Sequence, residues 1–222
     1  MATQWKFWSK MNLIPWSVNL LSLDQTEYFE TTLWSTQAFL SSYAELNGSE
    51  TVQINHSVIT MDPDEITQVI YGPADVLHLM SHAESGGTAQ GKRKFLGFIP
   101  LGTVFDPESL AEYASEISEY PEIECLLFDA CESGTATWAR KLRSIVAQGK
   151  KLTLIGTTRK VDIDETLAYT MAFYQVLLKQ GRPKTVAARH RAYSGAHEKA
   201  SQVFKQVRGR KCPFVLKAIV GK

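Results

Sequence analysis

The chain has 222 residues, of which 44% are hydrophobic and 21% charged, and its formal net charge is +1 at pH 7. This composition is typical of a soluble globular protein with one large core. The sequence contains no apolar run of the roughly 20 residues that a membrane span needs, and its aromatic start, followed by Pro15, makes a poor signal peptide, so we expect a cytoplasmic protein. Three cysteines at unrelated spacings indicate neither a disulfide framework nor a metal site, and we expect no cofactor.

Strand-like and helix-like segments alternate along the chain, after an irregular N-terminal arm predicted for residues 1–15. A polar, Gly-rich loop is predicted for residues 83–94 and a short hairpin for residues 95–104. The pattern predicts a single α/β domain over residues 1–222, a three-layer α/β/α sandwich with a mostly parallel sheet of about six strands. Strands are expected at 16–23, 51–60, 74–82, 123–129, 151–158 and 213–220, and helices at 24–47, 62–71, 106–118, 134–148, 162–178 and after 183.

Two of the predicted strands end in residues that can carry chemistry. The apolar run 126–128 stops at Asp129 and Ala130 and delivers Cys131, and the run 74–80 ends in Ser81 and His82. Open α/β sheets place their functional groups at the carboxyl ends of the strands. A single cysteine there is more often a small buried hydrophobic residue, but the pair of Cys131 and His82 points to thiol chemistry.

These residues resemble the caspase-like cysteine peptidases, and in particular their CHAT and metacaspase-like branch. The histidine of that family lies about 50 residues before the cysteine, and here His82 precedes Cys131 by 49 positions. The downstream stretches 154–178 and 181–188 are similar to the bacterial CHAT proteins. The resemblance covers about residues 74–195, and it implies a caspase-like fold and an endopeptidase activity on proteins.

The resemblance assigns catalytic roles to three positions. Cys131 is the expected nucleophile, with a pKa that the start of the following helix could lower, and His82 is the expected acid and base. The backbone N–H groups of Cys131 and Ala83 are the expected oxyanion hole, although Ala83 stands where the family usually has glycine.

An acidic specificity pocket is also implied by the resemblance. Asp129, two residues before the nucleophile, would bind a basic residue before the scissile bond, with Arg preferred over Lys. A simple helix-capping role for Asp129 is the alternative. Asp162 and Asp164 are secondary candidates for the same pocket, and helix-start residues are their alternative.

The family further implies a regulated effector protease of a bacterial stress or antiviral defence system, with other proteins, including gasdermin-like pore formers, as substrates. An activating partner or assembly is expected, with residues 83–94 and the N-terminal arm as possible receivers of the signal. Cleavage of the chain by itself at residues 92–94 is a further hypothesis. No membrane partner is expected.

The C-terminal region is basic, because residues 181–222 hold 11 of the 24 Lys and Arg residues but only one of the 23 Asp and Glu residues. The pattern predicts an amphipathic helix with a solvated basic face. A catalytically silent scaffold that binds an acidic partner or nucleic acid through this helix is the alternative function, although no nucleic-acid motif supports it. Surface or half-buried positions are expected for His56, His190 and His197, inert core positions for Cys125 and Cys212, and no zinc site at His78.

Overall fold

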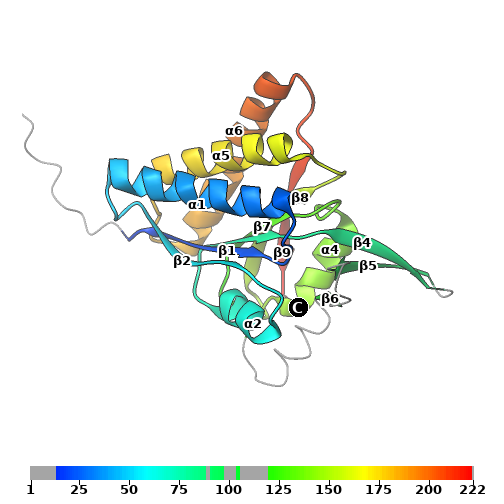
Figure 1. The fold of residues 1–222 in the computed structure, drawn as a ribbon. Helices are drawn as coiled ribbons and strands as arrows, with labels where there is room; N and C mark the ends of the chain where they lie inside the picture. The colour runs from blue at the N-terminus through cyan, green and yellow to red at the C-terminus, as the bar shows by residue number, and fades with distance from the viewer. Residues whose placement is uncertain (1–13, 89–90, 98–103, 106–119, 222) are drawn as a thin grey trace, which may run out of the picture.

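The computed structural model describes residues 14–88, 91–97, 104–105 and 120–221, and it describes side chains for 14–82 and 120–221. The predicted N-terminal arm, except for residues 14 and 15, and the predicted helix 106–118 lie outside this part of the chain. Within it, strands and helices alternate as the sequence indicates (Figure 1).

A six-stranded sheet forms the centre of the molecule, and it confirms the predicted α/β class. Its strand order is β2-β1-β3-β7-β8-β9, in which the first five strands are parallel and β9 runs antiparallel to β8. The chain crosses from β1 outward to β2 and then returns to β3 on the other side of β1, so the strand order reverses there. The strands are Trp16–Ser22 (β1), Val52–Ile59 (β2), Val76–Met80 (β3), Cys125–Asp129 (β7), Lys151–Thr157 (β8) and Phe214–Val220 (β9).

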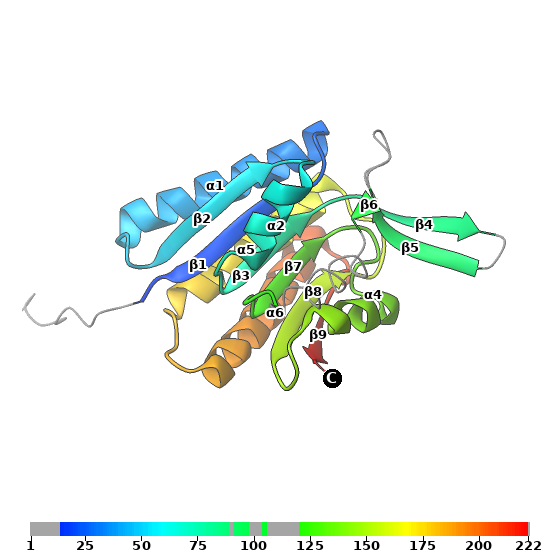
Figure 2. The ribbon, with the colours of Figure 1, turned by 90° about the horizontal axis from the view of Figure 1, so that it is seen from below.

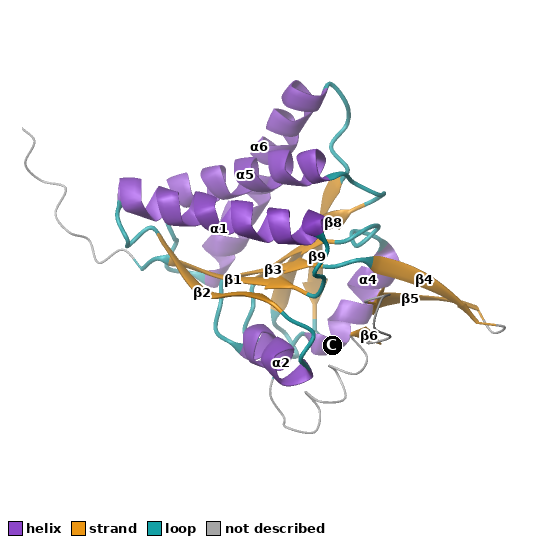
Figure 3. Cartoon of the chain, viewed as in Figure 1, coloured by secondary structure: helices purple, strands orange, loops and turns teal. Residues whose placement is uncertain are grey.

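Helices cover both faces of this sheet and give the expected three layers (Figures 1 and 3). One face packs against α1 (Glu27–Asn47), α5 (Ile163–Lys179) and α6 (Val186–Arg208), and the other against α2 (Pro63–Tyr71), α4 (Ala136–Lys141) and the 3-10 turn Leu142–Ile145. Strands β3 and β7 are buried along their whole length, as strands between two helical layers must be. None of the helices in the described ranges is long and apolar enough to cross a membrane.

Helix starts follow the sequence signals closely. Asp62 caps α2 by accepting hydrogen bonds from the backbone N–H groups of Asp64 and Glu65, with Pro63 in the first turn. Asp162 and Glu165 form a capping box at the start of α5. Two helical segments are shorter than predicted, because α1 begins at Glu27 rather than at residue 24, and the helical stretch after Cys131 covers residues 136–145 rather than 134–148.

The predicted loop at 83–94 is wrong. Ala83–Thr88 (β4) and Gly91–Gly97 (β5) pair as antiparallel strands, and Val104–Phe105 (β6) pairs with the end of β5, which confirms the hairpin expected within residues 95–104. Glycine and lysine have a low strand propensity, which is why these residues resembled a loop, but pairing of the two backbones overrides it. Figures 1 and 2 show β4 and β5 as a ribbon that projects from the main sheet where β3 ends.

Candidate active site

The two residues of the predicted dyad follow neighbouring strands at equivalent positions. Strands β3 and β7 are parallel neighbours, and their register pairs Met80 with Asp129. The pairing continues past the strand ends, because the backbone N–H of Ser81 donates to the carbonyl of Asp129 over 3.1 Å. His82 and Cys131 each lie two residues beyond the Met80–Asp129 pair. The register therefore brings both to the same carboxyl edge of the sheet.

His82 contacts a carboxylate that the sequence did not single out. Its Nε2 lies 3.3 Å from Oδ2 of Asp24, which follows β1, the strand on the other side of β3. Asp24 is fully buried, whereas the His82 side chain is 46% exposed. The ring of Phe29 packs edge-on against the imidazole, with 5.0 Å between the ring centres. The imidazole thus has one nitrogen facing Asp24, and its other nitrogen, Nδ1, is left for other partners.

Local hydrogen bonds hold Asp24 in place. Its Oδ1 accepts from the backbone N–H of Thr26 at 2.8 Å, and its backbone N–H and C=O both bond to the Ser22 hydroxyl. Apart from the contact with His82, Oδ2 has no hydrogen-bond partner within the described ranges. A buried carboxylate oxygen that faces one imidazole has the arrangement of a group that fixes a histidine's orientation. Asp24 was not predicted as a site residue because the adjacency of β1 and β3 cannot be read from the sequence alone.

The turn that carries Cys131 is fixed to the end of β8. The Thr157 hydroxyl donates to the carbonyl of Ala130 at 2.7 Å and accepts from the backbone N–H of Glu132 at 3.1 Å. The Ser133 hydroxyl joins the carbonyl of Phe128 to the backbone N–H of Thr157. These bonds hold the backbone on both sides of Cys131 against the end of β8.

Backbone conformation in the same turn depends on close packing. Glu132 has a positive φ of 58°, and a non-glycine residue rarely adopts this conformation. A Cβ atom at Gly134 would lie 2.6 Å from the carbonyl oxygen of Gly156, so β8 and the turn approach each other more closely than side chains would allow. Strain directly after the candidate nucleophile is typical of functional turns.

The thiol of Cys131 is not activated in the way that the sequence led us to expect. Helix α4 begins at Ala136, five residues later and with only six residues, so its start does not reach the thiol. Burial raises the pKa of Cys131 above its ordinary value, and the negative charges of Asp129 and Glu132 add to this effect. A backbone hydrogen bond from Val161 and the charge of Lys160 oppose it. The thiol is therefore mainly protonated at neutral pH and needs a base to become a nucleophile.

Asp129 is a buried carboxyl group without a cationic partner in the described ranges. Its side chain is 1% exposed, Oδ1 accepts a 3.3 Å hydrogen bond from the Thr166 hydroxyl, and Oδ2 has no partner among the described residues. Burial raises the pKa of Asp129 to about 7, and the bond from Thr166 lowers it in part. The Tyr28 hydroxyl bonds to Thr166 at 2.7 Å and extends this polar group onto α1. A simple helix cap is a poor description of Asp129, since no helix N–H bonds to it in that part of the chain.

Asp162 and Asp164 lie in a different environment. Both are exposed at the start of α5, where Asp162 caps the helix, and Arg208 lies 3.7 Å from Asp162 and 3.8 Å from Asp164. Arg210 contacts Asp162 and, at 3.0 Å, Glu165. These contacts give both residues the helix-start role that was their alternative, and they neutralise the acidic turn from within the chain.

Other expectations concern backbone and surface. Ala83 is the first residue of β4, so its backbone is extended and does not require the glycine that the resemblance would place there.

The solvated basic face predicted for the last helix is only partly correct. Arg189 is 7% exposed and bonds to Glu124, and Arg208 is occupied by the acidic turn. Only part of the basic helix is therefore free for a partner.

The remaining histidines and cysteines have mixed outcomes. His56 and His197 are half-buried as expected, but His190 is 4% exposed, which corrects its predicted surface position. His78 is fully buried, and burial lowers its pKa to about 3. Cys125 is a buried thiol, as predicted, whereas Cys212 is only half-buried. Within the described ranges, no group of three or more His, Cys, Asp or Glu residues could hold a metal ion.

Comparison with known proteins adds no assignment: no protein-family model matches the chain, and a search of curated proteins finds no match.

Proposed function

We propose that this protein is a caspase-like cysteine endopeptidase that cleaves protein substrates after basic residues, Arg in preference to Lys. The observation that carries the proposal is the register of β3 and β7, together with the 3.3 Å contact between His82 and Asp24. A thiol, an imidazole and an orienting carboxylate then follow three adjacent strands, β7, β3 and β1, at one edge of the sheet.

In the proposed reaction His82 takes the thiol proton of Cys131, and the thiolate attacks the carbonyl carbon of the scissile peptide bond. The C–N bond breaks as the imidazolium returns the proton to the departing amine, which leaves a thioester on Cys131. Water, deprotonated by His82, then hydrolyses the thioester. The backbone N–H groups of Cys131 and Ala83 are the proposed donors to the oxyanion.

Asp24 has a positioning role in this scheme. By accepting a hydrogen bond from Nε2, it would keep the proton of the neutral imidazole on that nitrogen and leave Nδ1 unprotonated toward the thiol. The raised pKa of Cys131 supports the need for such a base, because few thiolates form without one.

Asp129 is the proposed specificity residue. A buried carboxyl group with an unpartnered oxygen is costly, and a guanidinium would supply two hydrogen bonds and the missing charge. Since burial raises its pKa to about 7, binding of basic substrates should strengthen as the pH rises through 7.

The resemblance extends the proposal to biology. We also propose that the protein is a regulated effector in bacterial stress or antiviral defence. Another protein or an assembly would activate it, and a gasdermin-like pore former is a candidate substrate.

Hydrolysis of fluorogenic peptides ending in Arg, Lys, Asp or Leu tests the proposal. We expect turnover in the order Arg, Lys, then the others, and its complete loss in Cys131→Ala, with Cys212→Ala as a thiol control that keeps full activity. Turnover that survives Cys131→Ala would overturn the proposed nucleophile. A preference for Asp would keep the peptidase but overturn the role of Asp129.

A further inference from the structure

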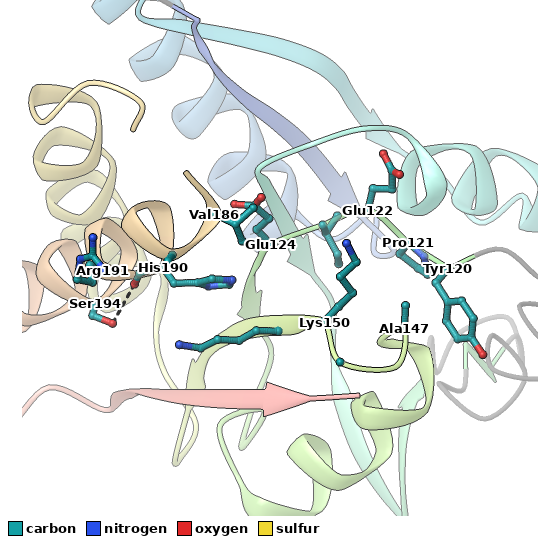
Figure 4. Close-up of a pocket in the computed structure, with 14 residues that line it drawn as sticks. Tyr120, Pro121, Glu122, Glu124, Ala147, Lys150, Val186, His190, Arg191 and Ser194 are labelled. Atoms are coloured by element: carbon teal, nitrogen blue, oxygen red, sulfur yellow. Dashed lines mark hydrogen bonds between the residues drawn. The ribbon is translucent and has the colours of Figure 1, made fainter. Parts of the chain in front are cut away.

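A large cavity lies at the edge of the sheet opposite to the thiol. Its volume is about 980 Å³, and it lies between the amino ends of β7 and β8 and the first turns of α6 (Figure 4). Among its lining residues, Ile123 lies just before β7, Lys151 is the first residue of β8, and Val186 is the first residue of α6. A cavity of this size accommodates a small organic ligand. The residues assigned to the peptidase reaction are absent from its lining.

Positive charge predominates around this cavity. Lys150, Lys151 and Arg191 line it, all three are exposed, and none of them makes an ion pair within the described ranges. Of the two acidic residues in the lining, Glu124 is neutralised by Arg189, which donates to it at 2.7 Å, so Glu122 is left. The balance favours an anionic ligand.

The wall of the cavity contains a buried imidazole with an unused nitrogen. His190 is 4% exposed, and its ring points from α6 toward Lys150 across the cavity (Figure 4). Its Nδ1 pairs with the Thr153 hydroxyl at 2.8 Å, and the ring also interacts with the backbone of Lys151, whereas Nε2 makes no hydrogen bond of regular geometry in the described part of the chain. If Thr153 donates this bond, the neutral ring carries its proton on Nε2, and that N–H needs an acceptor. An oxygen of a bound anion would supply one.

Helix α6 adds to the same preference. Its first residues, Val186 and Ala187, line the cavity, and the start of this 23-residue helix carries a partial positive charge. Ile123, Pro121 and the methyl group of Ala147 add apolar surface beside the charges. The ligand should therefore combine an anionic group with an apolar body.

We infer that this cavity binds a phosphate monoester with an apolar or aromatic body. The phosphate lies between Lys150, Lys151 and Nε2 of His190, and the body of the ligand packs on the apolar wall near Ile123 and Val186. This binding is independent of the proposed peptidase activity, so the failure of one proposal leaves the other intact.

Titration calorimetry of the full chain tests the inference with phenyl phosphate and with the 5′-monophosphates of adenosine and uridine. The matched controls each lack one part of the ligand. Phenol and the two nucleosides lack the phosphate group, and inorganic phosphate lacks the apolar or aromatic body. We expect saturable binding of at least one monoester, at least tenfold tighter than its phosphate-free counterpart and than inorganic phosphate.

Two variants locate the site. Lys150→Glu/Lys151→Glu should weaken monoester binding at least tenfold, and His190→Gln should weaken it severalfold, because the phosphate loses a donor. Lys199→Glu/Lys205→Glu is the control of equal charge, since both lysines are exposed farther along α6, and it should bind normally. Both lysines of the first variant are exposed, so that test stands even where His190→Gln fails to fold.

Three results would overturn the inference. They are no saturable binding of any of the three monoesters, equal binding of the phosphate-free probes, and equal weakening in the two double lysine variants.

Discussion

The acidic residues at the amino and carboxyl edges of the central sheet, that is, at the two ends of its parallel strands, have different kinds of partner. At the amino edge, Asp75 precedes β3 and Glu124 precedes β7. Arg182 donates two hydrogen bonds to Asp75, at 2.7 and 2.9 Å, and Arg189 binds Glu124 and lies 3.7 Å from Asp75. Both of these acidic residues therefore have a cationic partner within the chain.

At the carboxyl edge, Asp24 and Asp129 are at least as deeply buried, but no arginine or lysine pairs with them within the described ranges. Asp24 faces the half-exposed His82, and Asp129 faces the hydroxyl of Thr166. A buried acid without a compensating charge destabilises the fold unless it is protonated or binds something else. The ion pairs at the amino edge therefore stabilise the fold. At the carboxyl edge, Asp24 instead contacts an imidazole, and Asp129 remains able, in our proposal, to bind a basic substrate.

The largest effect is expected at the amino edge. Arg189→Met removes the cation from Glu124 and leaves two backbone carbonyls, those of Pro183 and Lys184, without their donor. Breaking a fully buried ion pair from one side typically costs about 3–5 kcal/mol. Because the Glu124 side chain is 16% exposed, we expect a loss near the lower end, about 3 kcal/mol, in the free energy of unfolding.

Urea denaturation followed by circular dichroism measures this loss. Arg191→Met, two residues later on the exposed side of α6, is the matched control and should change the free energy of unfolding by less than about 0.5 kcal/mol. If Arg189→Met and Arg191→Met lowered the free energy of unfolding equally, the ion pair with Glu124 would not stabilise the amino edge as we state.

Asp24→Asn tests the first acid of the carboxyl edge. The amide would present a different hydrogen-bonding pattern to Nε2 and would no longer favour the imidazole tautomer that leaves Nδ1 free. We expect kcat on an Arg peptide to fall by about 100-fold, with KM nearly unchanged, because the substrate does not contact Asp24 in our scheme.

Asp62→Asn is the matched control, since Asp62 also follows a strand and accepts hydrogen bonds from nearby backbone N–H groups, but its strand is β2, which is not adjacent to β3, the strand that precedes His82. Its kcat should be that of the wild type. A fall in kcat for both variants, or a change confined to KM, would contradict a positioning role for Asp24.

The sequence predicted the parts of this edge that local patterns encode. Apolar runs that stop at His82 and at Cys131 mark strand ends, and neighbouring parallel strands bring such ends together. Asp24 was missed because only the strand order, with β1 beside β3, makes it a neighbour of His82. The pairing of Arg189 with Glu124, 65 residues earlier, was missed for the same reason. Helical periodicity indicates an exposed and a buried face but not which buried acid a basic residue meets.

The smallest effect concerns the stability contribution of Asp129. Burial raises its pKa from 3.8 to about 7, so between these values the folded protein holds a proton that the unfolded chain has released. The contribution of Asp129 to the free energy of unfolding is therefore fully present below pH 4 and is lost as the pH rises through 7.

Asn cannot ionise, so the free energy of unfolding of Asp129→Asn should not show this decrease with pH. Between pH 5 and 7, the free energy of unfolding of the wild type should fall by roughly 2 kcal/mol more than that of the variant. Urea titrations of both proteins at a series of pH values measure the difference. Parallel curves would mean that Asp129 is ionised at neutral pH through a partner of its own, and the carboxyl edge would then resemble the amino edge.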